Sequence, residues 1–168
     1  ITGRNAQCRH STSILGSQPR PPLVRVFSEH LVLHNAPMDV NKTDQRALLK
    51  ELKKILPVDG VITDQAGLKP YETDGLTAIK EMPWVVALPE NEQQVVRIVK
   101  ACARHSVPII PRGAGTGLSG GARPHREGVV LGLSRMTEIL DVDCVGRMAR
   151  VQPGVRNAAI SEAAGVHG

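Results

Sequence analysis

The residues best suited to do chemistry lie in one glycine-rich run, PRGAGTGLSGGA, at positions 111–122. Five of nine consecutive residues in it are glycines. Glycine lacks the Cβ atom that would keep a ligand away from the backbone, and it adopts positive φ angles that turn successive N–H groups toward one point. Arg112 adds a positive charge, and Thr116 and Ser119 add hydroxyl groups. The run therefore predicts an anion-binding loop, and a diphosphate is the ligand that suits these donors.

Two well-known phosphate-binding motifs do not describe this run. Residues 115–120 match G-x-G-x-x-G, but a dinucleotide-binding motif must open a helix, and the glycines and the proline that follow disfavour one. A P-loop needs Lys and then Ser or Thr after its last glycine, where this chain has Gly121 and Ala122. The alternative without a ligand is a tight surface connection. Ligand binding is favoured because so many backbone donors without acceptors would be costly to enclose.

A strand, a helix and a second strand precede the run and must position it. The apolar residues 84–88, ended by a proline, predict a strand buried on both faces. Asn91 is suited to cap a helix over residues 91–105, whose apolar positions recur at helical spacing. Residues 107–110 predict the second strand. This order indicates a βαβ unit with a parallel pair of strands and a right-handed crossover.

Further elements are predicted on both sides of this unit. Apolar spacing indicates a helix that ends before Pro57 and that Asn41 or Thr43 could cap. A short apolar pair, Val61-Ile62, precedes a loop-rich stretch over residues 63–83. After the glycine-rich run we expect strands at 129–133, 139–143 and 149–152 and a helix at 156–164.

Residues 1–37 differ from the rest of the chain. They hold four arginines, one acidic residue and several Ser and Thr, and they show no sustained hydrophobic period. Three interpretations stay open: sequence upstream of an initiator at Met38, a mitochondrial transit peptide, for which this composition is typical, or a disordered native extension. We expect the chain to divide into residues 1–37 as a leader outside the domain, 38–82 as a helix and loop region, and 83–168 as the domain that holds the glycine-rich run.

Composition excludes several classes of protein. The formal charge is +5, but the chain has only three aromatic residues, too few and too scattered to stack on bases, so no nucleic-acid partner is predicted. The three cysteines are far apart, which predicts neither a disulfide framework nor a zinc site, and no metal ligands are assigned. No stretch approaches 18 consecutive apolar residues, so no transmembrane segment is predicted.

The glycine-rich run, together with Gly146-Arg147 and the segment VQPGVRN at 151–157, resembles a known family. It is similar to FAD-linked oxidases with the p-cresol methylhydroxylase and vanillyl-alcohol oxidase type of FAD-binding domain, and especially to the FAD-binding subunit of bacterial glycolate oxidase. D-lactate and D-2-hydroxyglutarate dehydrogenases belong to the same family. The resemblance covers residues 38–168 and implies an α+β fold, an incomplete form of this domain with a βαβ unit plus further strands.

The resemblance also implies where FAD binds. Some members attach FAD covalently through a His that would align with Thr116, and because threonine cannot form that bond we expect noncovalent FAD. Tyr71 and Asp74 are interpreted as structural loop residues, with lining of the FAD site as the alternative. The expected cofactor-binding residues are Pro89, Arg112, Gly113, Ala114, Gly115, Thr116, Gly117, Leu118, Ser119, Gly120 and Gly154.

The reaction implied is oxidation of a D-2-hydroxy acid, in which the flavin takes a hydride equivalent from Cα and leaves a 2-keto acid. Glycolate is the first expected substrate and D-lactate the second. The family's catalytic and substrate-binding residues are expected beyond residue 168, so none is assigned here and the 168-residue chain alone is expected to be inactive. Two alternatives are a flavin-dependent reductase of the cell-wall precursor type, which has the same fold, and a non-enzymatic nucleotide- or anion-binding module.

Partners and location follow from the same resemblance. Glycolate oxidase works with additional subunits, one of which carries iron–sulfur clusters, so such subunits are expected partners beside the small 2-hydroxy-acid substrate. The expected location is cytoplasmic, with peripheral association with the inner membrane. A mitochondrial location is the alternative if residues 1–37 are a transit peptide.

Overall fold

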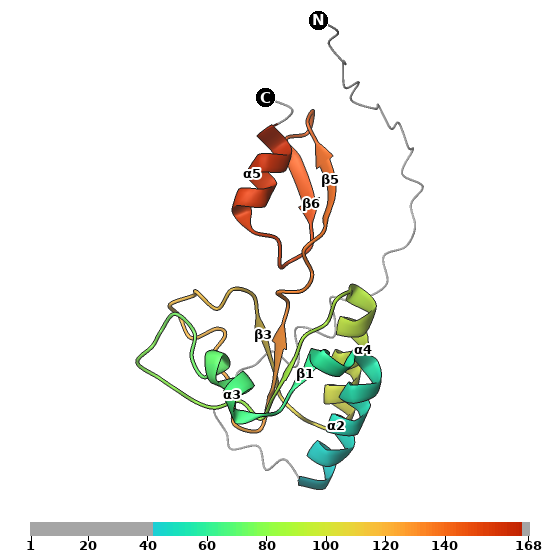
Figure 1. Ribbon diagram of the computed structural model, residues 1–168, viewed down its shortest axis with the longest axis vertical. Coiled ribbons are helices and arrows are strands. Elements are labelled where there is room, and N and C mark those ends of the chain that lie inside the picture. The colour runs from blue at the N-terminus through green and yellow to red at the C-terminus, as the bar shows by residue number, and fades with distance from the viewer. Residues whose placement is uncertain (1–41, 166–168) are drawn as a thin grey trace, which may run out of the picture. The chain divides into compact units, whose positions relative to one another are not determined.

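The computed structural model describes residues 42–165, so the predicted leader, residues 1–37, lies outside the described residues. Figure 1 shows the arrangement of the described elements. They follow one another as α2 (Lys42–Ile55), β1 (Val61–Ile62), α3 (Gln65–Leu68), β2 (Val85–Ala87), α4 (Glu92–Arg104), β3 (Ile109–Arg112), β4 (Val129–Gly132), β5 (Ile139–Asp143), β6 (Met148–Val151) and α5 (Asn157–Gly165), with short 3-10 turns at Val58–Gly60 and Lys69–Tyr71.

A four-stranded sheet with the order β1-β2-β4-β3 forms the centre of the fold. Strand β1 is antiparallel to β2, whereas β4 pairs in parallel with both β2 and β3. The predicted βαβ unit is present and its two strands are parallel, and β4 lies between them. All four residues of β4 are buried. This apolar strand therefore takes an inner position, and β3, which contains Pro111, lies at the edge, where a missing N–H is tolerated.

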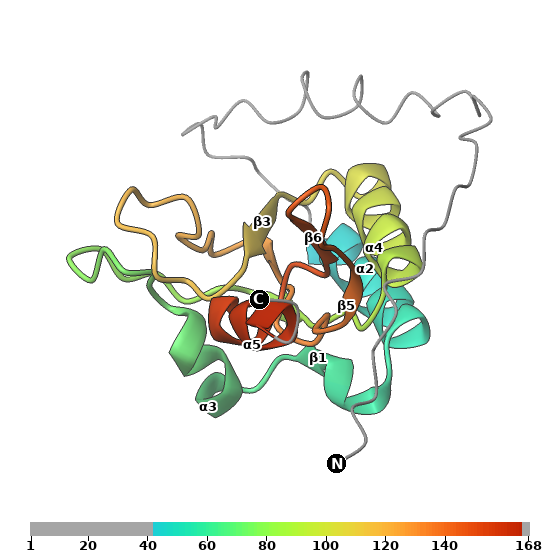
Figure 2. The same ribbon diagram turned by 90° about the horizontal axis from the view of Figure 1, so that it is seen from above.

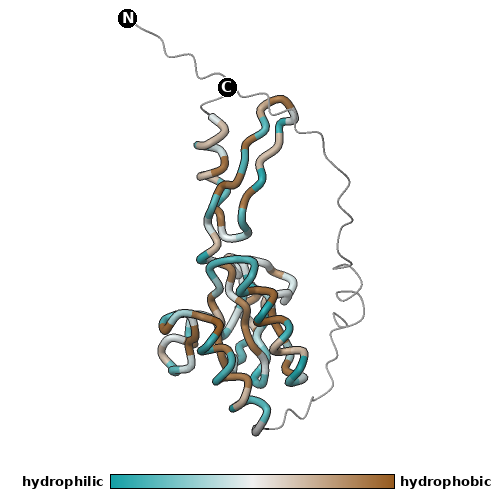
Figure 3. Tube along the Cα trace, turned by 90° about the vertical axis from the view of Figure 1, so that its right-hand side faces the viewer, coloured by the Kyte–Doolittle hydropathy of each residue, from teal (hydrophilic) through white to brown (hydrophobic). Residues whose placement is uncertain are grey.

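Helices α2 and α4 cover one face of the sheet and lie side by side (Figures 1 and 2). In Figure 3 brown and teal stretches alternate along the helices, as expected for elements with one buried side. The apolar side chains of both helices pack on alternate residues of β2 and β4. This core contains Leu48, Leu52, Ile55, Leu56, Val85, Ala87, Ile98, Ala101, Cys102, Val107, Val129 and Leu131.

The start of α4 confirms the predicted cap. The Oδ1 atom of Asn91 accepts a hydrogen bond of 3.0 Å from the Gln94 amide. Gln94 returns a bond through Oε1, but it accepts from the Glu90 amide, at 2.7 Å, and not from Asn91. At α2 the helix begins at Lys42, so Thr43 lies inside it and the interpretation of Thr43 as its cap is wrong, while Asn41 lies outside the described residues.

The opposite face of the sheet is covered by α3 and the turn after it. Leu68 and Tyr71 pack there with Val86, Leu88 and Val130. The sequence predicted only loop for this stretch, because a four-residue helix is too short to show a hydrophobic period. The sequence feature that could have indicated this helix is its N-cap residue, Asp64. The Asp64 side chain accepts a hydrogen bond of 2.8 Å from the Gly67 amide.

The remaining described elements are the β5–β6 hairpin and α5, all three as predicted. The two strands pair antiparallel with an irregularity between Ile139 and Asp141. Asp143 closes the turn, since its Oδ1 atom accepts hydrogen bonds from the amides of Val145 and Gly146. Within residues 42–165, no helix is long and apolar enough to cross a membrane.

Candidate functional site

The predicted site residues lie at one edge of the central sheet. Because β2, β4 and β3 are parallel, their carboxyl ends meet at that edge, where ligands of open α/β sheets bind. Pro89 follows β2 there and is fully buried. The glycine loop, residues 113–121, follows β3, and a turn at residues 133–136 follows β4.

Gly154 lies against the turn that follows β4. Its amide donates a hydrogen bond of 2.8 Å to the Met136 carbonyl. A Cβ atom at Gly154 would lie 2.5 Å from the Leu133 carbonyl oxygen and 2.7 Å from that of Met136. Glycine is therefore required here by the close approach of two backbone segments, which places Gly154 beside the same sheet edge.

The glycine loop presents unpaired backbone donors. In the part of the chain that the structure describes, none of the seven amides of residues 113–119 donates a hydrogen bond to a protein acceptor. Most of these residues are exposed, and the Leu118 side chain is 73% exposed. Buried N–H groups are nearly always paired, whereas exposed ones can bind water or a ligand. The loop thus offers a row of donors to an anion from solvent.

The glycines of the loop divide into two kinds. Gly113, Gly117 and Gly121 have no atom within 4 Å of the place where a Cβ would stand. Nothing inside the described chain explains these glycines, and the open space beside them is where a ligand could approach the backbone. Gly115 differs, because its φ is +71° and a Cβ there would overlap the Arg112 guanidinium. Gly120 has open space beside it but also a positive φ, of +75°, which among the five loop glycines it shares only with Gly115.

Arg112 holds the start of the loop. The residue ends β3 and is partly buried. Its Nη1 atom donates a hydrogen bond of 2.6 Å to the Thr73 carbonyl, and Nη2 donates one of 3.5 Å to that of Pro70. The guanidinium also stacks over the Tyr71 ring, 5.4 Å from its centroid. The sequence identified Arg112 as a charge beside the ligand but missed this role, which depends on residues some 40 positions away.

The same early segment touches the middle of the loop. A Cβ atom at Gly75 would lie 2.6 Å from the Thr116 carbonyl oxygen and 2.8 Å from that of Gly117. The two backbones are therefore in direct contact. The interpretation of Tyr71 as a structural residue of this segment agrees with its place under Arg112 and in the apolar layer of α3.

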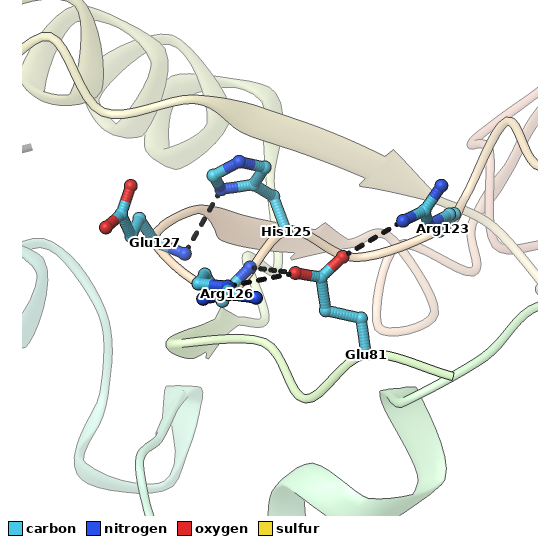
Figure 4. A network of polar contacts seen from close by, with 5 residues as sticks. All are labelled: Glu81, Arg123, His125, Arg126 and Glu127. Atoms are coloured by element: carbon cyan, nitrogen blue, oxygen red, sulfur yellow. Dashed lines mark hydrogen bonds and ion pairs between the residues drawn. The ribbon is translucent and has the colours of Figure 1, made fainter. Parts of the chain in front are cut away.

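The glycine loop is connected to β4 by a segment that Glu81 holds in place. Figure 4 shows its carboxylate between two arginines. Oε2 lies 3.4 Å from Nη2 of Arg123, and Oε1 accepts hydrogen bonds of 3.3 and 3.5 Å from the amide and Nε of Arg126. His125 Nδ1 accepts a bond of 3.1 Å from the Glu127 amide, which closes the turn. One segment, residues 69–82, thus holds both ends of the glycine-rich connection.

Titratable groups near this edge are engaged in structural contacts. Arg135 donates a hydrogen bond of 2.8 Å to Asp59, and this bond holds the pKa of the Asp59 carboxyl below its usual range. Away from this edge, in the core beneath α4, burial raises the pKa of the Cys102 thiol to about 12, so this residue packs as a neutral apolar group. Among residues 42–165 no three His, Cys, Asp or Glu gather as they would around a metal ion. The chemistry that the described loop offers is anion binding.

Comparison with known proteins agrees with this geometry. Residues 83–168, which include the glycine loop, match the FAD binding domain family, and the chain belongs to this family. Its fold is that of the p-cresol methylhydroxylase type: the chain matches the structure of p-cresol methylhydroxylase with a TM-score of 0.69 at 24% identity, over 77% of this chain and 26% of that one.

The chain is also similar to part of two curated relatives. The chain is 48% identical over 124 residues to the glycolate oxidase subunit GlcD of Escherichia coli K12, which is 74% of this chain and 25% of that protein. It is 45% identical over 85 residues to the D-lactate dehydrogenase of Archaeoglobus fulgidus, which is 51% of this chain and 19% of that protein. The chain therefore spans about a quarter or less of the length of these relatives.

The two kinds of glycine lead to a prediction for stability. Gly115→Ala should lower the free energy of unfolding by about 1–2 kcal/mol, because its backbone is left-handed and its new methyl group would displace Arg112. Gly117→Ala is the matched control and should change it by less than about 0.5 kcal/mol, since open space receives the methyl group. Urea unfolding of both variants measures the difference. Equal changes in the free energy of unfolding for the two substitutions would contradict the distinction between the two kinds of glycine.

Proposed function

We propose that the glycine loop binds the diphosphate of FAD in a flavoprotein oxidoreductase that acts on a D-2-hydroxy acid, with glycolate as the preferred substrate and D-lactate next. The observation that carries the proposal is the row of seven unpaired amides on residues 113–119. The match of residues 83–168 to the FAD binding domain family supports FAD as the ligand. The relatives named as a glycolate oxidase subunit and a D-lactate dehydrogenase support the substrate class.

The residues present suit this cofactor. A diphosphate carries negative charge and only acceptor oxygens, so amide donors and the nearby Arg112 guanidinium match it, and hydrogen bonds to charged groups are stronger than those between neutral ones. The open sides of Gly113 and Gly117 allow the phosphates to reach the backbone, and the Thr116 and Ser119 hydroxyls add donors. We assign Ala114, Leu118 and Gly120 to the same loop contact, with Pro89 and Gly154 at the flanking sheet edge.

Bound FAD would supply the acceptor for a hydride equivalent from Cα of the hydroxy acid. The described residues contribute binding and orientation to this reaction, and none of them is assigned as the base for the substrate hydroxyl. We further propose that the chain works with other oxidase subunits, an iron–sulfur subunit among them. The relative named as a subunit of glycolate oxidase supports this assembly.

Loss of open space at Gly117 should weaken FAD binding without unfolding the chain. In Gly117→Val the new side chain would occupy the space beside the amides, so the Kd for FAD should rise at least about tenfold, the equivalent of one lost charge-assisted hydrogen bond. Titration followed by flavin fluorescence measures this Kd. Gly165→Val is the control, because Gly165 also has open space but lies at the end of α5. Unchanged affinity in Gly117→Val would count against the loop as the binding site.

We propose that FAD is held without a covalent bond. The loop offers hydroxyl groups at Thr116 and Ser119 but no imidazole or thiol that could attach to a flavin. Acid precipitation of the FAD-loaded protein should therefore leave all flavin absorbance in the supernatant. Yellow colour that stays with the precipitated protein would contradict noncovalent binding.

A further inference from the structure

Asp74 is a buried acidic residue on the segment that contacts the glycine loop. Its side chain is only 6% exposed. Oδ1 accepts a hydrogen bond of 2.9 Å from the Leu76 amide and so caps a local turn. Oδ2 is also enclosed and has no partner, and it is the only buried side-chain N or O atom without one among the described residues. A buried acceptor that lacks a donor lowers stability, and more so when it carries charge.

Capping the turn does not explain this cost. A serine hydroxyl would cap the Leu76 amide with a single oxygen and would leave no second polar atom to enclose. Unsatisfied buried groups are rare in native proteins and indicate either strain or a function. The second oxygen of Asp74 is therefore explained best by a donor that reaches it in another state of the site.

The residues on both sides of Asp74 contact the glycine loop and the arginine at its start. Gly75, the next residue, is in contact with the carbonyl oxygens of Thr116 and Gly117 in the glycine loop. Thr73, the preceding residue, accepts the Arg112 hydrogen bond. The amides of this adjacent loop are unpaired donors, whereas Oδ2 exposes less than 1 Å² to solvent and is closed to a ligand in this structure.

We propose that Asp74 is a positioning residue for the glycine loop. When the loop takes up a diphosphate, one of its amides donates a hydrogen bond to Oδ2 of Asp74, and the remaining amides bind the ligand. By accepting this hydrogen bond, Asp74 holds the loop in the conformation in which its other amides point toward the ligand. This inference rests on the proposed function, because it assigns a residue that prepares the same loop for the same diphosphate.

Asp74→Asn tests this role, because it preserves the oxygen that caps Leu76 and replaces Oδ2 with an NH₂ group that cannot accept a hydrogen bond. Asp74→Ser is the second variant, with a hydroxyl cap and no second oxygen. Calorimetric titration of the 168-residue chain with pyrophosphate, ADP and FAD should give a Kd raised about tenfold or more for all three ligands in both variants. Melting temperatures without ligand should stay within about 5 °C of the unsubstituted chain.

Asp64→Asn is the matched control. It makes the same chemical change at an exposed aspartate that caps α3, away from the loop, and should leave all three affinities unchanged. Equal affinities in Asp74→Asn and the unsubstituted chain would overturn the inference, as would weakening confined to ADP and FAD, which would place Oδ2 on a ligand hydroxyl. Loss of cooperative unfolding in both Asp74 variants would also overturn it, since Asp74 would then be a structural residue. If the unsubstituted chain bound none of the three ligands, the proposed function itself would fail.

Discussion

The hydrogen bond from Arg112 to the Thr73 carbonyl is the interaction on which the candidate site depends. It joins the end of the edge strand β3 to a segment that precedes β2, and it is strengthened by the stacking of the guanidinium over Tyr71. Gly115 must be glycine because this guanidinium fills the space beside it. One side chain thus sets both the place where the glycine loop leaves the sheet and the backbone conformation that follows.

A second constraint is that backbone N–H groups need hydrogen-bond acceptors. A chain can leave seven consecutive amides unpaired only where solvent or a ligand reaches them, and the loop meets this condition because it projects from the carboxyl edge of the sheet. The segment 69–82 holds both ends of the connection, through Arg112 at one end and Glu81 at the other. Held at both ends and contacted by Gly75 in its middle, the loop still leaves its amides unpaired and open to an anion.

The sequence predicted the parts of this site that depend on local signals. Helical spacing, apolar strands and the Asn91 cap revealed the βαβ unit, and five glycines in nine residues revealed the loop. The insertion of β4 between β2 and β3 was not predicted, because strand order depends on burial across the whole sheet. The contacts of Arg112 and Gly75 were missed for a similar reason: their partners lie about 40 residues away, and no local pattern encodes them.

Binding of the FAD diphosphate by the amides of the glycine loop can be observed directly by NMR. The 18.1 kDa chain is small enough for a ¹H–¹⁵N correlation spectrum recorded during titration with FAD. We expect the largest chemical-shift changes on the amides of residues 113–119, where the structure leaves the N–H groups unpaired. Saturable binding of FAD that leaves these resonances unmoved while others shift would contradict this expectation.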